Sequence, residues 1–300
     1  MSSICVIGAG KWGQALHYAL SKNQKCLITS RTTKDIKNFV SLDKALECEY
    51  LVIAIPAQSI RGWLEKNFKF SGQKILVAAK GIEASSGKFL KEIYEEFAPG
   101  KNLGFISGPS FASEVIKGLP TALVLNSQEK TYYDEFSEFF PPFIKTYYSD
   151  DVIGAEIAGA YKNVLAIASG ICEGLQLGQN ARASLISRGL VEMSRFGNHF
   201  NAKDETFIGL SGAGDLFLTA SSELSRNFRV GIGLAKNKTL EDILEELGEV
   251  AEGVKTSEAI YKLSFDNKIY TPIANEVKLI LDGKSPQKSL KDLLSSTQYN

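Results

Sequence analysis

Three glycines near the start of the chain have the spacing of a nucleotide-binding turn. The segment VIGAGKWG places Gly8, Gly10 and Gly13 in the pattern G-x-G-x-x-G, after the apolar run 4–7 and before a helical pattern. In such a unit the first glycine permits a tight turn, the second lets the backbone approach a pyrophosphate, and the third lets the helix pack on the strand. Free N–H groups at the helix start attract the anion. The spacing therefore predicts a dinucleotide site.

Two residues beside this motif each allow two interpretations. Trp12 either packs against the first helical turn or places its ring beside the cofactor. The second predicted strand ends in Thr29-Ser30-Arg31, where an NAD-specific site usually has Asp or Glu bonding the adenosine ribose. Arg31 either pairs with a 2′-phosphate or stacks on adenine, or it is a solvated arginine at a strand end. The residues leave the preference between NAD and NADP open.

Lys162 is a candidate acid–base residue. If residues 152–170 form a helix, the face of this lysine also carries small or apolar side chains: Ala155, Ala158, Gly159, Leu165, Ala166 and Ser169. Burial in such a stripe disfavours the ammonium and lowers the pKa of the amine towards a value useful for proton transfer. A lysine in an apolar helix more often extends its amine to the surface, so the spacing alone leaves both interpretations open.

Polar residues after two predicted strands could bind a ligand. Lys80 ends an apolar run, so its amine projects at the carboxyl edge of the predicted sheet, where open α/β folds place their ligands. Its alternative is a strand-end lysine in water. The turn Gly108-Pro109-Ser110 follows the next apolar run. Lys80 is therefore a candidate ligand residue at this sheet edge, whereas a glycine and proline turn is often only a turn.

Polar residues of the second half suit an anionic substrate. Ser225, Arg226 and Asn227 supply hydroxyl, guanidinium and amide donors of the kind that hold a phosphate monoester. Asp215 follows a glycine-rich segment without a preceding strand, so the residues alone predict a helix N-cap there. Glu252 is by the same reasoning a carboxylate near a helix start.

Charge and cysteine content exclude several classes of protein. The 34 Lys and Arg balance 34 Asp and Glu, so the chain lacks the basic surplus of a nucleic-acid or anionic-membrane binder. No Cys-x-x-Cys pair or other set of ligands has metal spacing, and neither His17 nor His199 matches a catalytic motif. We expect reduced core thiols of a cytoplasmic protein at four positions, Cys5, Cys26, Cys48 and Cys172.

The longest apolar run does not predict a membrane span. Residues 152–172 are interrupted by Glu156 and Lys162, and the chain begins without a basic and apolar leader. We therefore expect neither stable membrane insertion nor a signal peptide. A homodimer is compatible with a helical domain that can pair with its copy.

The pattern of apolar residues predicts two domains of different type. Continuous apolar runs alternate with helical patterns in the first half, which indicates strands over 4–7, 26–29, 51–55, 75–79, 103–106 and 122–125. Such alternation is typical of a doubly wound parallel sheet with right-handed crossovers. After residue 148 helical spacing dominates. The α/β chain should therefore have a Rossmann-like NAD(P)-binding domain in 1–149 and an all-helical substrate-binding and catalytic domain in 150–300.

Five segments, in the same order across both halves, closely resemble the NAD(P)-dependent glycerol-3-phosphate dehydrogenases. This family of soluble enzymes interconverts dihydroxyacetone phosphate and sn-glycerol 3-phosphate. The segments are GAGKWGQAL (8–16), AAKGIE (78–83), ISGPSFASE (106–114), GAYKNVLAIASG (159–170) and GAGDLFLTASSELSRN (212–227). The resemblance runs essentially from end to end, so it is far more specific than one glycine motif.

The resemblance implies a role for each candidate. Lys162 matches the family's proton-transferring lysine, and Asp215 is placed beside it to orient it and to bond a substrate hydroxyl. The implied substrate contacts are Lys80, Gly108, Ser110, Lys162, Asp215, Ser225, Arg226 and Asn227. The implied cofactor contacts are Gly8, Gly10, Lys11, Trp12, Gly13, Arg31, Lys80, Ala112, Arg226, Val250 and Glu252.

The activity implied by the resemblance is reversible hydride transfer between NAD(P)H and dihydroxyacetone phosphate, with Lys162 as general acid and base. It would supply glycerol 3-phosphate for phospholipid synthesis in the cytoplasm. Two alternatives remain. A related two-domain β-hydroxyacid dehydrogenase would prefer a carboxylate substrate, and a catalytically silent dinucleotide-binding protein would be expected to lack Lys162 or Asp215.

Overall fold

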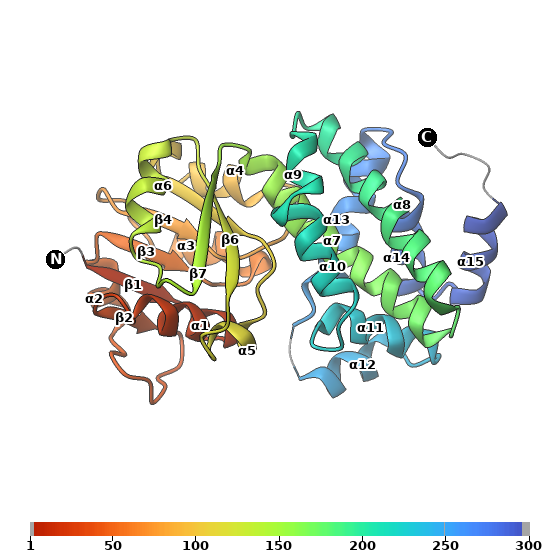
Figure 1. The fold of residues 1–300 in the computed structure, drawn as a ribbon, viewed down its shortest axis with the longest axis horizontal. Helices are drawn as coiled ribbons and strands as arrows, with labels where there is room; N and C mark the ends of the chain where they lie inside the picture. The colour runs from red at the N-terminus through yellow and green to blue at the C-terminus, as the bar shows by residue number, and fades with distance from the viewer. Residues whose placement is uncertain (1–2, 249, 296–300) are drawn as a thin grey trace. The chain divides into compact units, whose positions relative to one another are not determined.

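The computed structural model describes residues 3–248 and 250–295, which fold into two compact units (Figure 1). The first unit comprises Met1–Lys80 and Lys88–Glu156, and the second comprises Gly81–Gly87 and Ile157–Asn300. The predicted boundary at residue 149 coincides with the end of strand β7 (Ile144–Ser149). The chain passes into the second unit seven residues later, inside helix α7 (Val152–Gly174).

A seven-stranded sheet forms the centre of the first unit. Its strand order is β2-β1-β3-β4-β5-β6-β7. The strands before β7 are β1 (Ile4–Ile7), β2 (Cys26–Thr29), β3 (Tyr50–Ile53), β4 (Lys74–Val77), β5 (Leu103–Ser107) and β6 (Thr121–Asn126). Strands β1, β3 and β5 are buried along their whole length because helices cover both faces, which explains their continuous apolar sequences.

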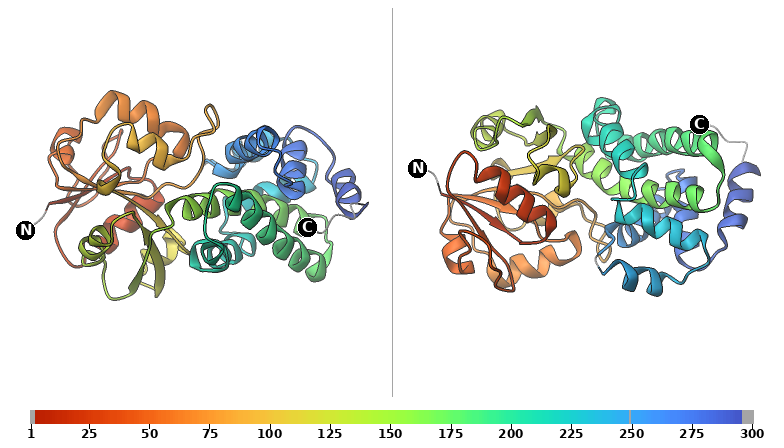
Figure 2. Two further views of the ribbon diagram at one scale, coloured as in Figure 1. Left: turned by 90° about the horizontal axis from the view of Figure 1, so that it is seen from above. Right: turned by 60° about the horizontal axis from the view of Figure 1, so that its bottom comes forward.

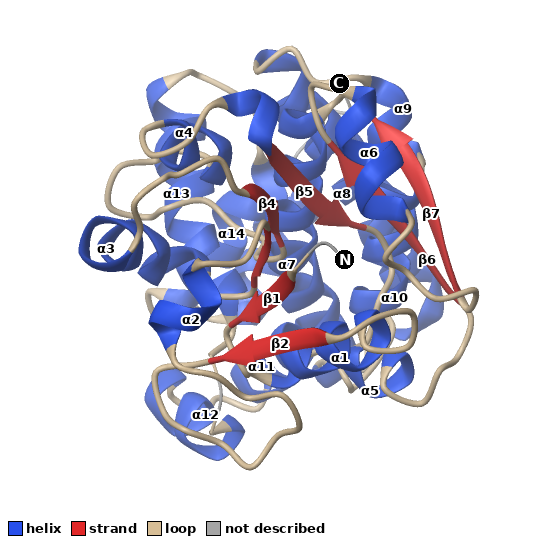
Figure 3. Ribbon diagram, turned by 90° about the vertical axis from the view of Figure 1, so that its left-hand side faces the viewer, coloured by secondary structure: helices blue, strands red, loops and turns tan. Residues whose placement is uncertain are grey.

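Helices lie on the two faces of this sheet (Figure 3). Two separate clusters of apolar side chains are buried there. One cluster contains α1 residues such as Leu16, and the other contains α3 residues such as Ile60. The helices of this unit are α1 (Lys11–Leu20), α2 (Leu42–Leu46), α3 (Ala57–Asn67), α4 (Leu90–Glu95), η1 (Gly100–Asn102), α5 (Ala112–Val115) and α6 (Lys130–Ser137). The predicted doubly wound architecture is confirmed.

The sheet departs from the predicted parallel arrangement at one junction. Strand β6 is antiparallel to β5, and β7, which we did not predict, pairs parallel with β6. A parallel return needs a crossover long enough to span the sheet, but the β5–β6 connection contains only the four-residue helix α5. The chain therefore begins β6 at the edge where β5 ended. Strand β7 escaped prediction because it alternates buried and exposed residues, unlike the central strands.

The second unit contains helices only among its described residues, as two further views show (Figure 2). Asp151 directly precedes the buried helix α7, and its carboxylate accepts a hydrogen bond of 2.9 Å from the Gly154 N–H. The others are α8 (Gly178–His199), α9 (Asp204–Ile208), η2 (Leu210–Gly214), α10 (Asp215–Ala220), α11 (Arg226–Ala235), α12 (Leu240–Leu247), α13 (Glu252–Asp266), α14 (Pro272–Leu281) and α15 (Pro286–Ser295).

All four cysteines are free and buried, as predicted for core thiols. Burial raises the pKa of Cys26 to about 12, and it raises that of Cys5 further. Such thiols are poor nucleophiles at neutral pH. In the described ranges no helix has the length and apolar character needed to cross a bilayer. The same ranges contain no group of three or more His, Cys, Asp or Glu side chains arranged for a metal ion.

Candidate active site

The glycine turn between β1 and α1 has the geometry of a backbone cradle. Gly8 has φ +109°, a conformation that L side chains rarely adopt, and a Cβ on Gly13 would lie 1.8 Å from the Gly8 carbonyl oxygen. Gly10 differs, because a Cβ there would meet nothing within 4 Å. The predicted structural roles of Gly8 and Gly13 are confirmed. The open space at Gly10 fits the place where a pyrophosphate would approach the backbone.

The first turn of α1 is suited to an anion. Its N-cap is Gly10, which offers no side-chain cap, and its first turn contains no acidic residue. The backbone N–H groups at this end therefore keep their capacity to bind an external acceptor. Lys11 is exposed at the same end. A dinucleotide cofactor thus fits the residues present on two independent grounds, the space at Gly10 and the uncapped helix.

Two side chains fix the glycine turn. The Trp12 indole N–H donates to the Ala78 carbonyl oxygen at 3.1 Å, just beyond β4. Lys34, which follows β2, donates from Nζ to the Ala9 carbonyl oxygen at 2.7 Å. The structural interpretation of Trp12 as a packing residue is supported, since the ring also packs against the apolar cluster of α1. Its contact with cofactor stays a prediction, as does that of the exposed Arg31.

Three predicted ligand residues converge at the β4–β5 edge of the sheet. The Lys80 amine donates to the Gly108 carbonyl oxygen at 3.3 Å, and the Ser110 hydroxyl donates to the same oxygen at 3.2 Å. Gly108 has φ +103°, which lets the chain turn sharply after β5. Ala112 begins α5 directly afterwards. The first unit therefore presents an amine and a hydroxyl together where open α/β sheets bind ligands.

The candidate catalytic centre of the second unit is a buried ion pair. Lys162 Nζ on α7 lies 2.6 Å from Asp215 Oδ1 on α10, and their side chains are 10% and 2% exposed. The same amine donates to the Thr219 hydroxyl at 3.2 Å, one turn along α10. The interpretation of Lys162 as a surface lysine is wrong. A buried ammonium is costly unless it is paired, and the Asp215 carboxylate supplies that pairing.

Asp215 is not the N-cap that the residues alone suggested. The π-helical turn η2 runs directly into α10, whose N-cap is Gly214 and whose first residue is Asp215. The side chain is therefore inside a continuous helical path and accepts from Lys162. Single π-helical turns occur frequently at functional sites because the extra residue re-aims nearby side chains.

A chain of amides connects α7 to two further helix starts. Asn227 Nδ2 donates to Asn163 Oδ1 at 2.9 Å, and Asn227 Oδ1 accepts from the Gly253 N–H at 3.0 Å. Gly253 follows Glu252, the first residue of α13. Asn227 thus links Asn163, the neighbour of Lys162, to the start of α13, where the predicted residue Glu252 lies. The residues alone predicted Glu252 at a helix start, and this is confirmed.

The predicted phosphate cradle lies at the start of α11. Ser225 is its N-cap and accepts from the Phe228 N–H at 3.3 Å, while Arg226 is exposed and Asn227 is buried. Helix α11 crosses α7 closely, because a Cβ on Gly170 would lie 2.0 Å from the Phe228 carbonyl oxygen. Val250, in contrast, is 59% exposed in the segment before α13 and contacts none of these groups in the described bonds.

Three residues of these sites escaped sequence reasoning: Thr219, Asn163 and Lys34. The first two could have been found, because Thr219 is one helical turn after Asp215 and Asn163 adjoins Lys162. Lys34 gave no such signal, since only the path of the chain after β2 brings it to Ala9.

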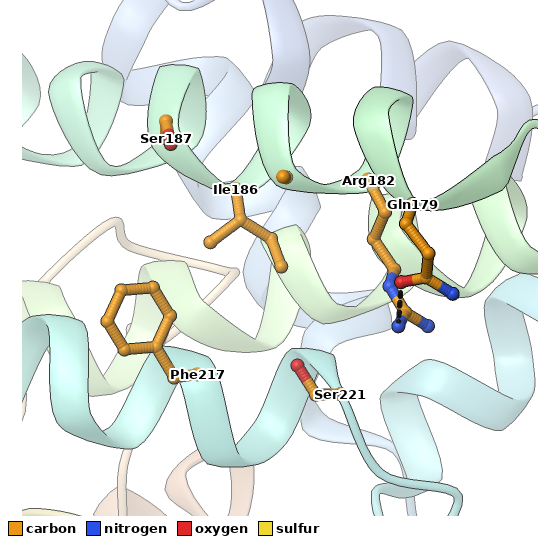
Figure 4. Close-up of a pocket in the computed structure, with 7 residues that line it drawn as sticks. Gln179, Arg182, Ile186, Ser187, Phe217 and Ser221 are labelled. Atoms are coloured by element: carbon orange, nitrogen blue, oxygen red, sulfur yellow. Dashed lines mark hydrogen bonds between the residues drawn. The ribbon is translucent and has the colours of Figure 1, made fainter.

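A hollow of about 340 Å³ between α8 and α10 belongs to neither site (Figure 4). Ile186, Ser187, Phe217 and Ser221 are among its lining residues. The Arg182 guanidinium beside it is already bonded to Gln179 at 2.6 Å and to Glu173 at 2.7 Å. None of the predicted site residues lines this hollow.

Comparison with known proteins decides which enzymes share this arrangement. The model of the NAD-dependent glycerol-3-phosphate dehydrogenase C-terminus matches residues 151–292, and that of the N-terminus matches residues 19–133. Glycerol-3-phosphate dehydrogenase [NAD(P)+] of Sulfurimonas denitrificans is 63% identical over 296 residues, which are 99% of this chain and 100% of the relative. The chain belongs to the NAD-dependent glycerol-3-phosphate dehydrogenase family. The resemblance carried by the five sequence segments is therefore confirmed.

Other glycerol-3-phosphate dehydrogenases are similar to this chain over nearly its whole length. The enzyme of the same name from Campylobacter lari is 61% identical over 295 residues, 98% of either chain. A crystal structure of glycerol-3-phosphate dehydrogenase from Coxiella burnetii is 30% identical, with a TM-score of 0.90 and coverage of 98% of this chain and 99% of that chain. The N-terminal family model begins at residue 19, so the glycine turn lies outside its match, whereas the Sulfurimonas relative spans nearly the whole chain.

Proposed function

We propose that this chain catalyses the reversible reduction of dihydroxyacetone phosphate to sn-glycerol 3-phosphate with NAD(P)H, with Lys162 as the general acid and base. The observation that carries the proposal is the buried amine of Lys162, paired with Asp215 at 2.6 Å within a member of this enzyme family. A buried amine held in one position by a carboxylate can transfer a proton to a bound substrate oxygen.

Lys162 acts on the oxygen at C2 of the substrate. In the reducing direction its ammonium donates a proton to the carbonyl oxygen, and in the oxidising direction its neutral amine accepts the hydroxyl proton. Asp215 stabilises the ammonium and fixes its position, and Thr219 holds the amine from a second side. General acid–base catalysis of this kind contributes about 10²- to 10⁴-fold to the rate.

The cofactor and the phosphate are assigned to separate groups. NAD(P)H, when bound, supplies the hydride. The pyrophosphate would be held by the backbone of the glycine turn and the start of α1, and the adenosine end by Arg31. Further proposed contacts are Lys11, Trp12, Lys80, Ala112, Arg226, Val250 and Glu252. For the substrate we propose Ser225, Arg226 and Asn227 at the phosphate, with Lys80, Gly108 and Ser110 at the remaining polar groups.

The proposed function is tested by initial rates of NADPH and NADH oxidation with purified protein. We expect turnover with dihydroxyacetone phosphate and none above background with β-keto acids, because three donor groups at the start of α11 suit a phosphate monoester. Turnover with a β-keto acid alone would assign the chain to the β-hydroxyacid dehydrogenases. Cofactor binding without oxidation of NAD(P)H by either substrate would indicate a silent dinucleotide-binding protein.

The presence and pairing of Lys162 and Asp215 argue against a silent binder. We further propose that residues 1–149 hold the cofactor and residues 150–300 the catalytic amine and phosphate site. The enzyme would act in the cytoplasm, where it would supply glycerol 3-phosphate for phospholipid synthesis, and it would assemble as a homodimer. Size-exclusion chromatography with light scattering tests the last point.

A further inference from the structure

The end of strand β2 and the glycine turn form one continuous surface in the first unit. The Gly8 N–H donates to the carbonyl oxygen of Thr29, the last residue of β2, at 2.8 Å. Lys34 returns to the same turn and donates from Nζ to the Ala9 carbonyl oxygen at 2.7 Å. In Rossmann-like sites the adenosine ribose lies between these two segments. The Lys34 ammonium is therefore held at the surface where the end of β2 meets the glycine turn.

Cationic side chains outnumber carboxylates around this position. Thr29 is 2% exposed, and the Ser30 hydroxyl donates to the Thr32 carbonyl oxygen at 2.7 Å. Arg31 and Lys34 are exposed, and neither forms an ion pair with a carboxylate in the part of the chain that the structure describes. Asp35 is the one acidic residue in the segment 30–37, which also contains Lys37. The segment thus carries three cations, Arg31, Lys34 and Lys37, against one carboxylate, and this balance favours a phosphate over an uncharged ribose hydroxyl.

We propose that Lys34 is a specificity-determining residue of the cofactor site, forming with Arg31 a two-cation site for the 2′-phosphate of NADP(H), so that this chain prefers NADP(H) to NAD(H). The inference rests on the proposed function, and it specifies NADP(H) where the proposed function allows either NAD(H) or NADP(H). Lysine and arginine can only donate hydrogen bonds, whereas NAD-specific sites accept one from the 2′-hydroxyl. An ammonium has three donors, and the bond to Ala9 uses one of them.

The expected size of the effect follows from the charge of the phosphate. A hydrogen bond to a charged group contributes about 1.5 to 3 kcal/mol, which corresponds to roughly 10- to 100-fold in affinity. Exposure of both cations allows salt to screen them, so measurements belong at one fixed, near-physiological ionic strength. We expect the loss of Lys34 to lie near the lower end of this range, because Arg31 remains.

The test uses two fragments of the adenosine end, adenosine 2′,5′-bisphosphate and AMP, titrated calorimetrically into the full-length protein. We expect the native protein to bind the bisphosphate at least about 10-fold more tightly than AMP. Lys34→Met should reduce that ratio about 10-fold while AMP affinity stays within about 2-fold. Lys37→Met is the matched control, because it removes the same charge from the same segment and should leave both affinities unchanged.

Three results would overturn the inference. Equal affinities of the native protein for the two fragments would show that it has no site for the 2′-phosphate. An equal loss of affinity for both fragments in Lys34→Met would show that Lys34 only stabilises the glycine turn. If Lys37→Met lost as much bisphosphate affinity as Lys34→Met, the effect would come from the overall positive charge of the segment and not from a specific contact of Lys34.

Turnover separates this inference from the proposed function. A higher kcat/KM with NADPH than with NADH, reversed or abolished in Lys34→Met, supports the inference. Faster reduction of dihydroxyacetone phosphate with NADH in the native protein contradicts the cofactor preference and leaves the proposed function intact. Selective binding of the bisphosphate without reduction of dihydroxyacetone phosphate contradicts the proposed function alone.

Discussion

The glycine turn of the first unit and the Lys162 centre of the second are built from different parts of the chain. The turn consists of backbone from one six-residue segment, Gly8–Gly13, and its fold depends on the absence of side chains at Gly8 and Gly13. The Lys162 centre consists of side chains from α7 and α10, and Lys162 and Asp215 are 53 residues apart in sequence. A backbone site should fail when a methyl group is added, whereas a side-chain site should fail when a functional group is removed.

The largest effect is expected at the side-chain site. Lys162→Met should lower kcat for dihydroxyacetone phosphate by about 10²- to 10⁴-fold, because it removes the proposed general acid. Cofactor affinity, measured by the fluorescence of bound NADPH, should stay within about 3-fold, because the glycine turn lies in the other unit. Lys262→Met, an exposed lysine on α13, is the control and should retain native kcat.

Removal of Lys162 also leaves Asp215 buried without its cation, which typically destabilises a fold by about 3 to 5 kcal/mol. Circular dichroism must therefore show that the variant is folded at the assay temperature. A folded Lys162→Met protein with native kcat would contradict the role of this amine. Loss of NADPH affinity in the folded variant would contradict the independence of the two sites.

The second effect tests the backbone site. Gly13→Ala should destabilise the protein by about 3 kcal/mol or more, because its Cβ would lie 1.8 Å from the Gly8 carbonyl oxygen and the backbone must shift. Gly10→Ala should keep the native melting temperature and yet weaken NADPH binding, since its Cβ enters open space proposed for the pyrophosphate. Thermal denaturation and fluorescence titration give the two readouts.

Gly62→Ala is the matched control for these substitutions. A Cβ at Gly62 meets nothing within 4 Å, and the residue lies inside α3, so alanine should stabilise the helix by up to about 1 kcal/mol without changing cofactor affinity. A native NADPH affinity in Gly10→Ala would show that the pyrophosphate does not bind at Gly10.

The third effect concerns a buried carboxylate that, unlike Asp215, forms no ion pair within the described ranges of the chain. Glu156 on α7 accepts from the Lys91 N–H at 2.9 Å, and burial raises its pKa to about 8. Between the unfolded value of 4.5 and this value, the folded state holds a proton that the unfolded state has lost. Stability from this group is thus complete below pH 4.5 and lost as the pH rises to about 8.

Glu156→Gln should therefore remove part of the fall in stability between pH 5 and 8, by on the order of a few kcal/mol at most. The measurement is urea denaturation of both proteins across this pH range. Glu241→Gln, at an exposed position of α12, should leave the native pH dependence unchanged. Parallel curves for native protein and Glu156→Gln would show that Glu156 titrates normally.

The smallest effect is expected at Thr219. Thr219→Val removes the hydroxyl that lies 3.2 Å from the Lys162 amine, and one neutral hydrogen bond is worth about 0.5 to 1.5 kcal/mol. We expect kcat to fall about 2- to 10-fold with KM for NADPH unchanged, and Thr219→Ser to restore it. A loss as large as that of Lys162→Met would make the hydroxyl an essential catalytic group.

Much of the fold and one of the two sites follow from local sequence. The continuous apolar runs identified six strands, because a strand buried on both faces needs apolar residues without interruption. The seventh strand, β7, and the antiparallel pairing of β6 did not follow, because pairing direction depends on the length of the connection through α5 rather than on the strands. The glycine turn followed directly, because φ +109° at Gly8 and the packing at Gly13 are requirements of neighbouring residues.

By itself the sequence determined the residue types at each site, the family and the division into a strand-rich and a helical half. Only tertiary structure decided that the Lys162 amine is buried against Asp215 and Thr219, and that Lys34 reaches Ala9. The reason is physical. A backbone turn is defined by the torsions and contacts of adjacent residues, whereas the partners of a side chain depend on how distant helices and loops pack, and no local spacing encodes that.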